Sequence, residues 1–115
     1  MSEIKKLTEK IIAFRDARDW KQFHNPKDVA LSLMLEAAEL GEHFQWKNEK
    51  EIKEHIKTYK KEISDELADV LYWVLLMAND LGIDMVKASE NKLKEIAKKY
   101  PVSKSKGKHS KYDQL

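Results

Sequence analysis

The chain has 115 residues, of which 37% are charged, and its formal net charge is +2. This length supports one compact domain with a modest core. Because the chain contains no cysteine, disulfide frameworks, thiolate zinc sites and cysteine nucleophiles are excluded. Its apolar runs fall well short of the roughly 20 residues that a membrane-spanning helix needs. The first residues also lack the apolar stretch of a signal peptide. We therefore expect a cytoplasmic protein with no membrane partner.

Apolar residues recur at helical spacing, and only three glycines and two prolines interrupt the chain, which predicts an all-α fold. The first helix should carry an apolar stripe and end before Asp19. A second should run from Pro26 to about Trp46, since Asn25 can cap it and proline fits a first helical turn. The apolar stripes of these two helices are Ile4, Leu7, Ile11 and Phe14, then Val29, Leu33, Ala37, Leu40 and Phe44.

A short amphipathic piece around Ile52 and Ile56 should lead into a long helix from about Tyr59 to Leu81, with Gly82 as its C-terminal cap. Its expected core stripe is Ile63, Leu67, Val70, Leu71, Val74 and Ala78. A last helix should start at Asp84 and end before Pro101. We assign residues 1–102 to one domain and residues 103–115 to a basic C-terminal tail.

Two of these helices carry paired acids beside their apolar stripes: Glu36 with Glu39, and Glu66 with Asp69. Residues three apart lie on the same side of a helix, so the two flanks can face each other. Converging carboxylates repel unless their pKa values rise or a cation binds. Oxygen ligands without cysteine favour Mg²⁺ or Mn²⁺. The same spacing also occurs on solvated helices, where the acids would be plain surface charge.

Three segments around these acids extend the pattern: RDWKQFHNP at 18–26, LEAAELGEHFQWK at 35–47 and DELADVLY at 65–72. Together they resemble the MazG-like nucleotide pyrophosphohydrolases, in particular the dCTP pyrophosphatase branch, and the resemblance runs from about Ile11 to Tyr112. It implies a helical bundle of four to five helices per chain that is completed by dimerisation, often as a dimer of dimers. It also implies a Mg²⁺-dependent enzyme, with Mn²⁺ as a possible substitute, that splits a (deoxy)nucleoside triphosphate into the monophosphate and pyrophosphate.

Carried over by this resemblance, the metal ligands are Glu36, Glu39, Glu66 and Asp69. Glu39 or Glu36 would orient or deprotonate the attacking water. Trp20 and Trp46 match positions that contact the base, and Lys92 matches a lysine that faces phosphate. From the residues alone, we would instead assign the tryptophans to core or dimer contacts.

Two aromatic side chains near these segments are further candidates for the substrate site. His24 could touch phosphate or an acid, although a histidine beside an apolar face is commonly structural. Trp73 follows Asp69 by one turn and could wall the pocket or pack at a subunit interface.

Two departures from the family pattern bear on substrate choice. Leu35 precedes Glu36 where the broader family has another acid, a change that the dCTP branch shares. Ile96 replaces an asparagine that helps to read the nucleotide, and nearby Asn91 is a possible substitute. A non-catalytic helical oligomeric module for nucleotide binding or protein interaction remains the alternative. The lysines of the tail form no ordered basic face, so we expect no stable nucleic-acid complex.

Overall fold

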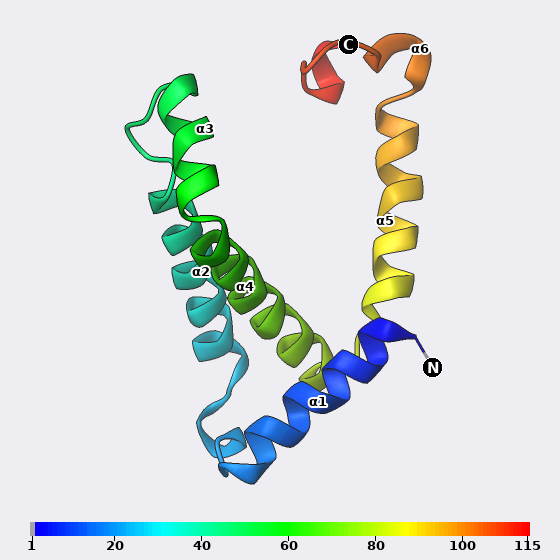
Figure 1. The fold of residues 1–115 in the computed structure, drawn as a ribbon. Coiled ribbons are helices and arrows are strands. Elements are labelled where there is room, and N and C mark those ends of the chain that lie inside the picture. The colour runs from blue at the N-terminus through cyan, green and yellow to red at the C-terminus, as the bar shows by residue number, and fades with distance from the viewer. Residues whose placement is uncertain (1) are drawn as a thin grey trace. The chain divides into compact units, whose positions relative to one another are not determined.

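The computed structural model describes residues 2–115, which form two compact units, 2–82 and 83–115 (Figure 1). The first unit contains α1 (Glu3–Ala17), η1 (Lys21–Phe23), α2 (Pro26–Glu42), α3 (Glu49–Thr58) and α4 (Lys60–Asp80). The second contains α5 (Met85–Lys99), α6 (Val102–Ser105) and η2 (Tyr112–Gln114). Every regular element in these residues is a helix, which confirms the all-α prediction.

Helix starts follow the local capping chemistry of the sequence. The side chain of Asn25 accepts a hydrogen bond from the Asp28 N–H at 2.9 Å, and Pro26 occupies the first helical position of α2, as predicted. Asn48 and Glu51 form a capping box at the start of α3, with bonds of 3.0 and 2.9 Å. Gly82 follows α4 with a φ of 68°, as expected of a C-terminal cap.

The second helix ends earlier than predicted. Its last residue is Glu42 rather than one near Trp46. The Phe44 N–H bonds to the Gly41 carbonyl at 3.1 Å, which closes the helix with tight turns. Trp46 itself has a φ of 65°, a left-handed conformation that interrupts a right-handed helix. The predicted boundary was therefore wrong, because apolar periodicity continued past the point where the backbone turned.

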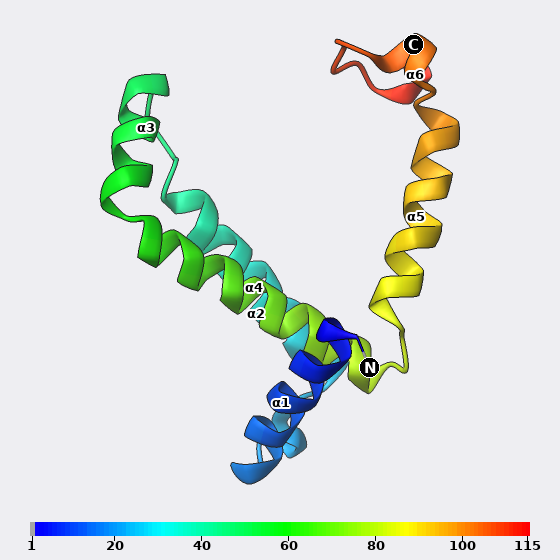
Figure 2. The same ribbon diagram turned by 45° about the vertical axis from the view of Figure 1, so that its right-hand side comes forward.

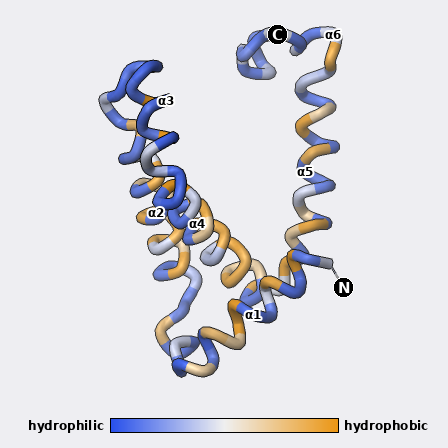
Figure 3. The backbone as a smooth tube through the Cα atoms, in the orientation of Figure 1, coloured by the Kyte–Doolittle hydropathy of each residue, from blue (hydrophilic) through white to orange (hydrophobic). Residues whose placement is uncertain are grey.

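The core lies where α1 crosses the C-terminal half of α4, while α2 and α4 lie side by side and antiparallel (Figures 1 and 2). Its buried apolar side chains come from all three helices: Ile11, Val29, Leu75, Leu76 and Ala78. Leu67 and Leu71, which we placed in the core stripe, are 53% and 40% exposed. No described element covers that face, although Figure 3 shows hydrophobic residues along α4. This part of the core prediction was wrong for the single chain.

One ion pair, buried on its Arg15 side, ties α1 to the end of α4. The Arg15 side chain is 1% exposed and donates from Nη1 to Oδ2 of Asp80 at 2.7 Å. The hydrogen bond to Asp80 raises the pKa of Arg15. Burial alone would raise the pKa of Asp80, but the hydrogen bond and charge of Arg15 hold it below its ordinary value. The pair therefore stays charged on both sides at neutral pH.

The second unit folds the basic tail back on the end of α5. The Tyr112 N–H donates to the Tyr100 hydroxyl at 3.0 Å, and the Lys99 ammonium lies 4.8 Å from the centre of the Tyr112 ring. The division at residues 102 and 103 stays a prediction. Within residues 2–115, no helix combines the length and the apolar character that crossing a bilayer requires.

Removing one partner of the buried ion pair should destabilise the fold more than removing both. We expect Asp80→Ala to lower the free energy of unfolding by about 2 kcal/mol, because it leaves the buried Arg15 charge with only the 3.7 Å contact of Asp16. The double variant Arg15→Met with Asp80→Ala should lose less. Urea unfolding of the three proteins measures this, and an equal loss in both variants would argue against the charge-pair explanation.

Candidate functional site

An acid cluster forms where α2 and α4 run side by side. Glu36 and Glu39 lie one turn apart on α2, and Glu66 reaches them from α4. One carboxylate oxygen from each of the three lies within 4.8 Å of the others. The structure thus brings together acids that are 27 to 30 residues apart in the sequence.

The cluster is electrostatically strained. Burial, followed by the charges of Glu39 and Asp69, raises the pKa of Glu36 to about 7. Burial and the neighbouring Glu39 also raise the pKa of Glu66. Oε2 of Glu36 and Oε2 of Glu66 are buried without a hydrogen-bond partner among the described residues. These oxygens can be satisfied by a proton or by a cation.

The donor set fits a hard divalent cation. All three groups offer carboxylate oxygen, and the shared space collects negative charge that no nearby lysine or arginine of the described residues pairs with. Asp69, the fourth predicted ligand, falls outside the close group. Its charge nevertheless raises the pKa of both Glu36 and Glu66, which places it beside the cluster. The role of these four acids as metal ligands stays a prediction.

The two tryptophans predicted to contact a base differ in their surroundings. Trp20 precedes η1 and packs edge-on against Phe14, with ring centres 5.7 Å apart, while 41% of it remains exposed. Trp46 is 91% exposed in the turn after α2 and stacks on no other aromatic ring of the described residues. A large apolar side chain held in solvent by a left-handed backbone is available for a ligand or another chain.

His24 and Trp73 meet on the flank of α4 that follows the acids. Their ring centres lie 5.4 Å apart in an edge-on arrangement. Nδ1 of His24 is buried and has no hydrogen-bond partner among the described residues. Trp73 follows Asp69 by one turn, so the two predicted substrate residues lie next to the predicted metal ligands along the helix.

Lys92, the predicted phosphate-facing residue, lies on α5 in the second unit. Its ammonium is 3.4 Å from Oε1 of Glu95, and its side chain is 62% exposed. Such an exposed pair contributes little stability and leaves the lysine free to exchange partners. Its contact with phosphate stays a prediction.

Sequence reasoning missed a histidine pair beside the cluster. Nδ1 of His43 lies 2.8 Å from Nε2 of His55, and the Tyr59 ring stacks 4.7 Å from His55. Burial, followed by the charges of Lys47 and His43, lowers the pKa of His55. The pair joins the end of α2 to α3. Because the apolar pattern predicted that α2 continues through this turn, the contact between the two histidines could not be predicted. The sequence signal for this contact is that His43 and His55 lie on either side of a polar segment.

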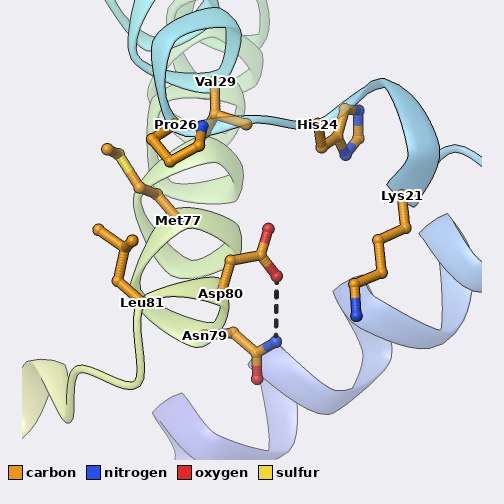
Figure 4. Close-up of a pocket in the computed structure, with 8 residues that line it drawn as sticks. All are labelled: Lys21, His24, Pro26, Val29, Met77, Asn79, Asp80 and Leu81. Carbon is orange, nitrogen blue, oxygen red and sulfur yellow. Dashed lines mark hydrogen bonds between the residues drawn. The ribbon is translucent and has the colours of Figure 1, made fainter.

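A pocket of about 340 Å³ adjoins the same flank, between η1, the start of α2 and the end of α4 (Figure 4). Its apolar lining is formed by residues at the start of α2 and the end of α4: Pro26, Val29, Met77 and Leu81. Its polar lining consists of Lys21, His24, Asn79 and Asp80. Of these polar residues only His24 was a predicted site residue. The pocket's size and mixed lining are typical of small-molecule sites.

The fold and the acid cluster together define a class of all-α protein with a carboxylate site between two antiparallel helices. Residues 31–115 match the model of the MazG-like family. The chain belongs to this family, which confirms the resemblance read from its motifs.

Curated relatives and a solved structure agree with this assignment. Rat dCTP pyrophosphatase 1 is 36% identical over 104 residues, which cover 89% of this chain and 61% of the relative. Human dCTP pyrophosphatase 1 is 32% identical over the same length. The chain thus spans about 61% of the length of these relatives. A crystal structure of a pyrophosphatase from Archaeoglobus fulgidus superposes with a TM-score of 0.83 at 34% identity, covering 88% of this chain and 94% of that one.

The raised pKa of Glu36 predicts a pH-dependent stability of the metal-free protein. A carboxyl whose pKa is higher in the folded state stabilises the fold below its ordinary pKa, and this contribution is lost as the pH rises through about 7. Glu36→Gln, which removes the repelling charge, should therefore raise Tm at about pH 8 and change it little at about pH 5.

Thermal unfolding followed by circular dichroism in a chelator measures this effect. Glu54→Gln, an equivalent change at an exposed position of α3, is the matched control and should show no such pH-dependent gain. An equal Tm for wild type and Glu36→Gln at high pH would contradict the strained cluster.

Proposed function

We propose that the chain is a Mg²⁺-dependent nucleoside triphosphate pyrophosphohydrolase that prefers dCTP-like substrates and accepts Mn²⁺ as a substitute. Its products are the nucleoside monophosphate and pyrophosphate. The observation that carries this proposal is the cluster of Glu36, Glu39 and Glu66, with two buried carboxylate oxygens that lack hydrogen-bond partners among the described residues. The pyrophosphatase names of the relatives point the same way.

The acids divide the chemical work between binding and proton transfer. Glu36, Glu39, Glu66 and Asp69 would hold Mg²⁺, which when bound neutralises phosphate charge and makes a coordinated water more acidic. Glu39 or Glu36 orients the attacking water and accepts its proton as the water oxygen bonds to phosphorus. The bond from that phosphorus to the oxygen that bridges the α- and β-phosphates then breaks, which yields the monophosphate and pyrophosphate.

The substrate contacts follow from the exposed aromatic and basic groups. Trp46 offers a flat face for stacking on the base, and Trp20 offers a second, partly exposed ring. His24 and Trp73 lie beside the acids on the α4 flank, where the sugar or the phosphates would pass. Lys92 supplies a positive charge that would pair with phosphate after leaving Glu95.

We also propose that the chain works as a homo-oligomer in the cytoplasm, with a dimer of dimers as the expected form and no nucleic-acid partner. Large apolar side chains are exposed along one face of α2 and one face of α4: Leu31, Met34, Leu35, Leu67 and Leu71. Their i, i+3, i+4 spacing forms continuous apolar stripes. A soluble monomer rarely leaves such stripes in water, so a second copy is the occupant that completes the bundle.

Glu39→Gln should reduce pyrophosphate release from dCTP in the presence of Mg²⁺ by about a hundredfold or more, because it removes a metal ligand or a proton acceptor. An enzyme-coupled pyrophosphate assay measures the rate. Glu9→Gln, at an exposed position of α1, is the matched control and should retain the wild-type rate. If wild type releases no pyrophosphate from any nucleoside triphosphate, or if Glu39→Gln matches it, the catalytic proposal fails.

Met34→Glu should dissociate the oligomer, because it places a charge within the exposed apolar stripe of α2, where Met34 is 59% exposed. Sedimentation velocity should show a lighter species than wild type. Val102→Glu, which changes another exposed apolar residue in the second unit, should leave the assembly unchanged. A wild type that sediments as a monomer would contradict this proposal.

A further inference from the structure

The turn between α2 and α3 is joined at its base by two histidines. Residues 43–48 form this turn, at the end of the α2–α4 pair that lies away from α1 (Figure 1). Nδ1 of His43, the first residue of the turn, lies 2.8 Å from Nε2 of His55 in the middle of α3. Apart from the capping box at Asn48, no other side-chain hydrogen bond within residues 2–115 joins this turn to α3.

Trp46 lies within the turn, and the backbone rather than its own contacts determines where its ring points. The residue is 91% exposed, so neighbouring side chains hold little of the ring. Its φ of 65° lies in the left-handed region, which a non-glycine residue adopts only where its surroundings impose it. The Lys47 N–H bonds to the Phe44 carbonyl at 3.4 Å across it. The direction of the Trp46 ring therefore depends on how firmly the two ends of the turn are held.

The histidine pair is anchored in aromatic packing. The ring of His55 stacks on Tyr59, with centres 4.7 Å apart, and meets Phe44 edge-on at 6.2 Å. Both histidines are half-buried. Burial, followed by the charges of Lys47 and His43, lowers the pKa of His55, so this ring is neutral at neutral pH. A neutral imidazole carries one donor and one acceptor nitrogen, so its contact with His43 is a hydrogen bond and not a repulsion between two cations.

One member of the pair lies beside the acid cluster. His43 follows Glu39 by one turn along the path of α2. Burial raises the pKa of Glu66, and the charge of His43 opposes that rise, so His43 lies near the cluster. The turn therefore leads within three residues from the acids, where the phosphates would bind, to Trp46, the proposed base contact.

We propose that His55, through its hydrogen bond to His43, is a positioning residue that fixes the turn so that the Trp46 ring faces the base of a bound nucleotide. His43 opens the turn and His55 lies on the helix that follows it, so the bond closes the turn at both ends. Without the bond, the left-handed backbone at Trp46 can relax, and a base would have to order the ring before stacking on it. This inference rests on the proposed function for the identity of the ligand.

His55→Phe removes the hydrogen bond but keeps a ring beside Tyr59. It should raise the KM for dCTP about fivefold or more while kcat changes less than about twofold, because it weakens stacking of the base and leaves the acids in place. The Mg²⁺ complex of pyrophosphate has no base, so its affinity in calorimetric titration should stay at the wild-type value. His109→Phe, at an exposed position of the tail, is the matched control and should change neither quantity. An unchanged KM, or an equal weakening of pyrophosphate binding, would overturn the proposal.

Further variants separate positioning from packing. His55→Gln supplies a hydrogen-bonding group near the place of Nε2, so its KM should return to within about twofold of wild type. His55→Phe combined with Trp46→Ala should raise KM no further than Trp46→Ala alone, because the pair acts through that ring. Additive effects of the two changes, or no recovery in His55→Gln, would refute the positioning role. Should His55→Phe fold poorly, His43→Leu removes the same bond from the other side and should reproduce the rise in KM.

Hydrogen–deuterium exchange of the nucleotide-free protein tests the turn without any substrate. Backbone amides of residues 44–48 should exchange faster in His55→Phe than in wild type or His55→Gln, because the turn opens more often. Equal exchange in the three proteins would contradict the role of the bond in holding the turn. If wild type shows no turnover but exchange rises as expected, the hydrolase proposal fails and the role of the pair in holding the turn stands. Turnover with an unchanged KM in His55→Phe refutes this inference alone.

Discussion

The antiparallel contact between α2 and α4 is the constraint on which the site depends. It brings Glu36, Glu39 and Glu66 within 4.8 Å of one another, at an electrostatic cost that raises the pKa of Glu36 to about 7. The fold tolerates this cost because apolar contacts elsewhere on α4, around Leu75 and Leu76, hold the helices in register. The apolar packing between the helices therefore holds the acids in place, although the acids themselves are not part of that packing.

The uneven burial of α4 follows from the same arrangement. Its C-terminal half is covered by α1 and buries Leu75, Leu76 and Ala78, whereas Leu67 and Leu71 near the acids remain exposed. A chain of this length can bury only part of its apolar surface by itself. The exposed stripe lies on the half of α4 that carries Glu66 and Asp69, so an occupant of that stripe would also wall the acid cluster. Assembly and catalysis are therefore coupled in the proposed enzyme.

Local chemistry made much of the fold predictable, and tertiary contacts account for what was not. The caps at Asn25 and Gly82 were readable because each depends on residues within one turn. The end of α2 was not, because Phe44 continues the apolar period while the backbone turns at Trp46. The spacing of Glu36, Glu39 and Glu66 indicated a cation site. The Arg15–Asp80 pair spans 65 positions and left no periodic signal, so it became visible only when α1 crossed α4.

Two carboxylate environments on α4 show how one helix separates a chemical task from a structural one. Around Glu66 the neighbours are acids, so a cation must come from solution, and its binding can be reversed by protons. Around Asp80 the cation is Arg15, built into the core, so the carboxylate is ionised whether or not a ligand is present. The first arrangement suits a group that must accept metal and protons during turnover. The second suits a group that must stay charged to hold α1 against the end of α4, so its task is structural.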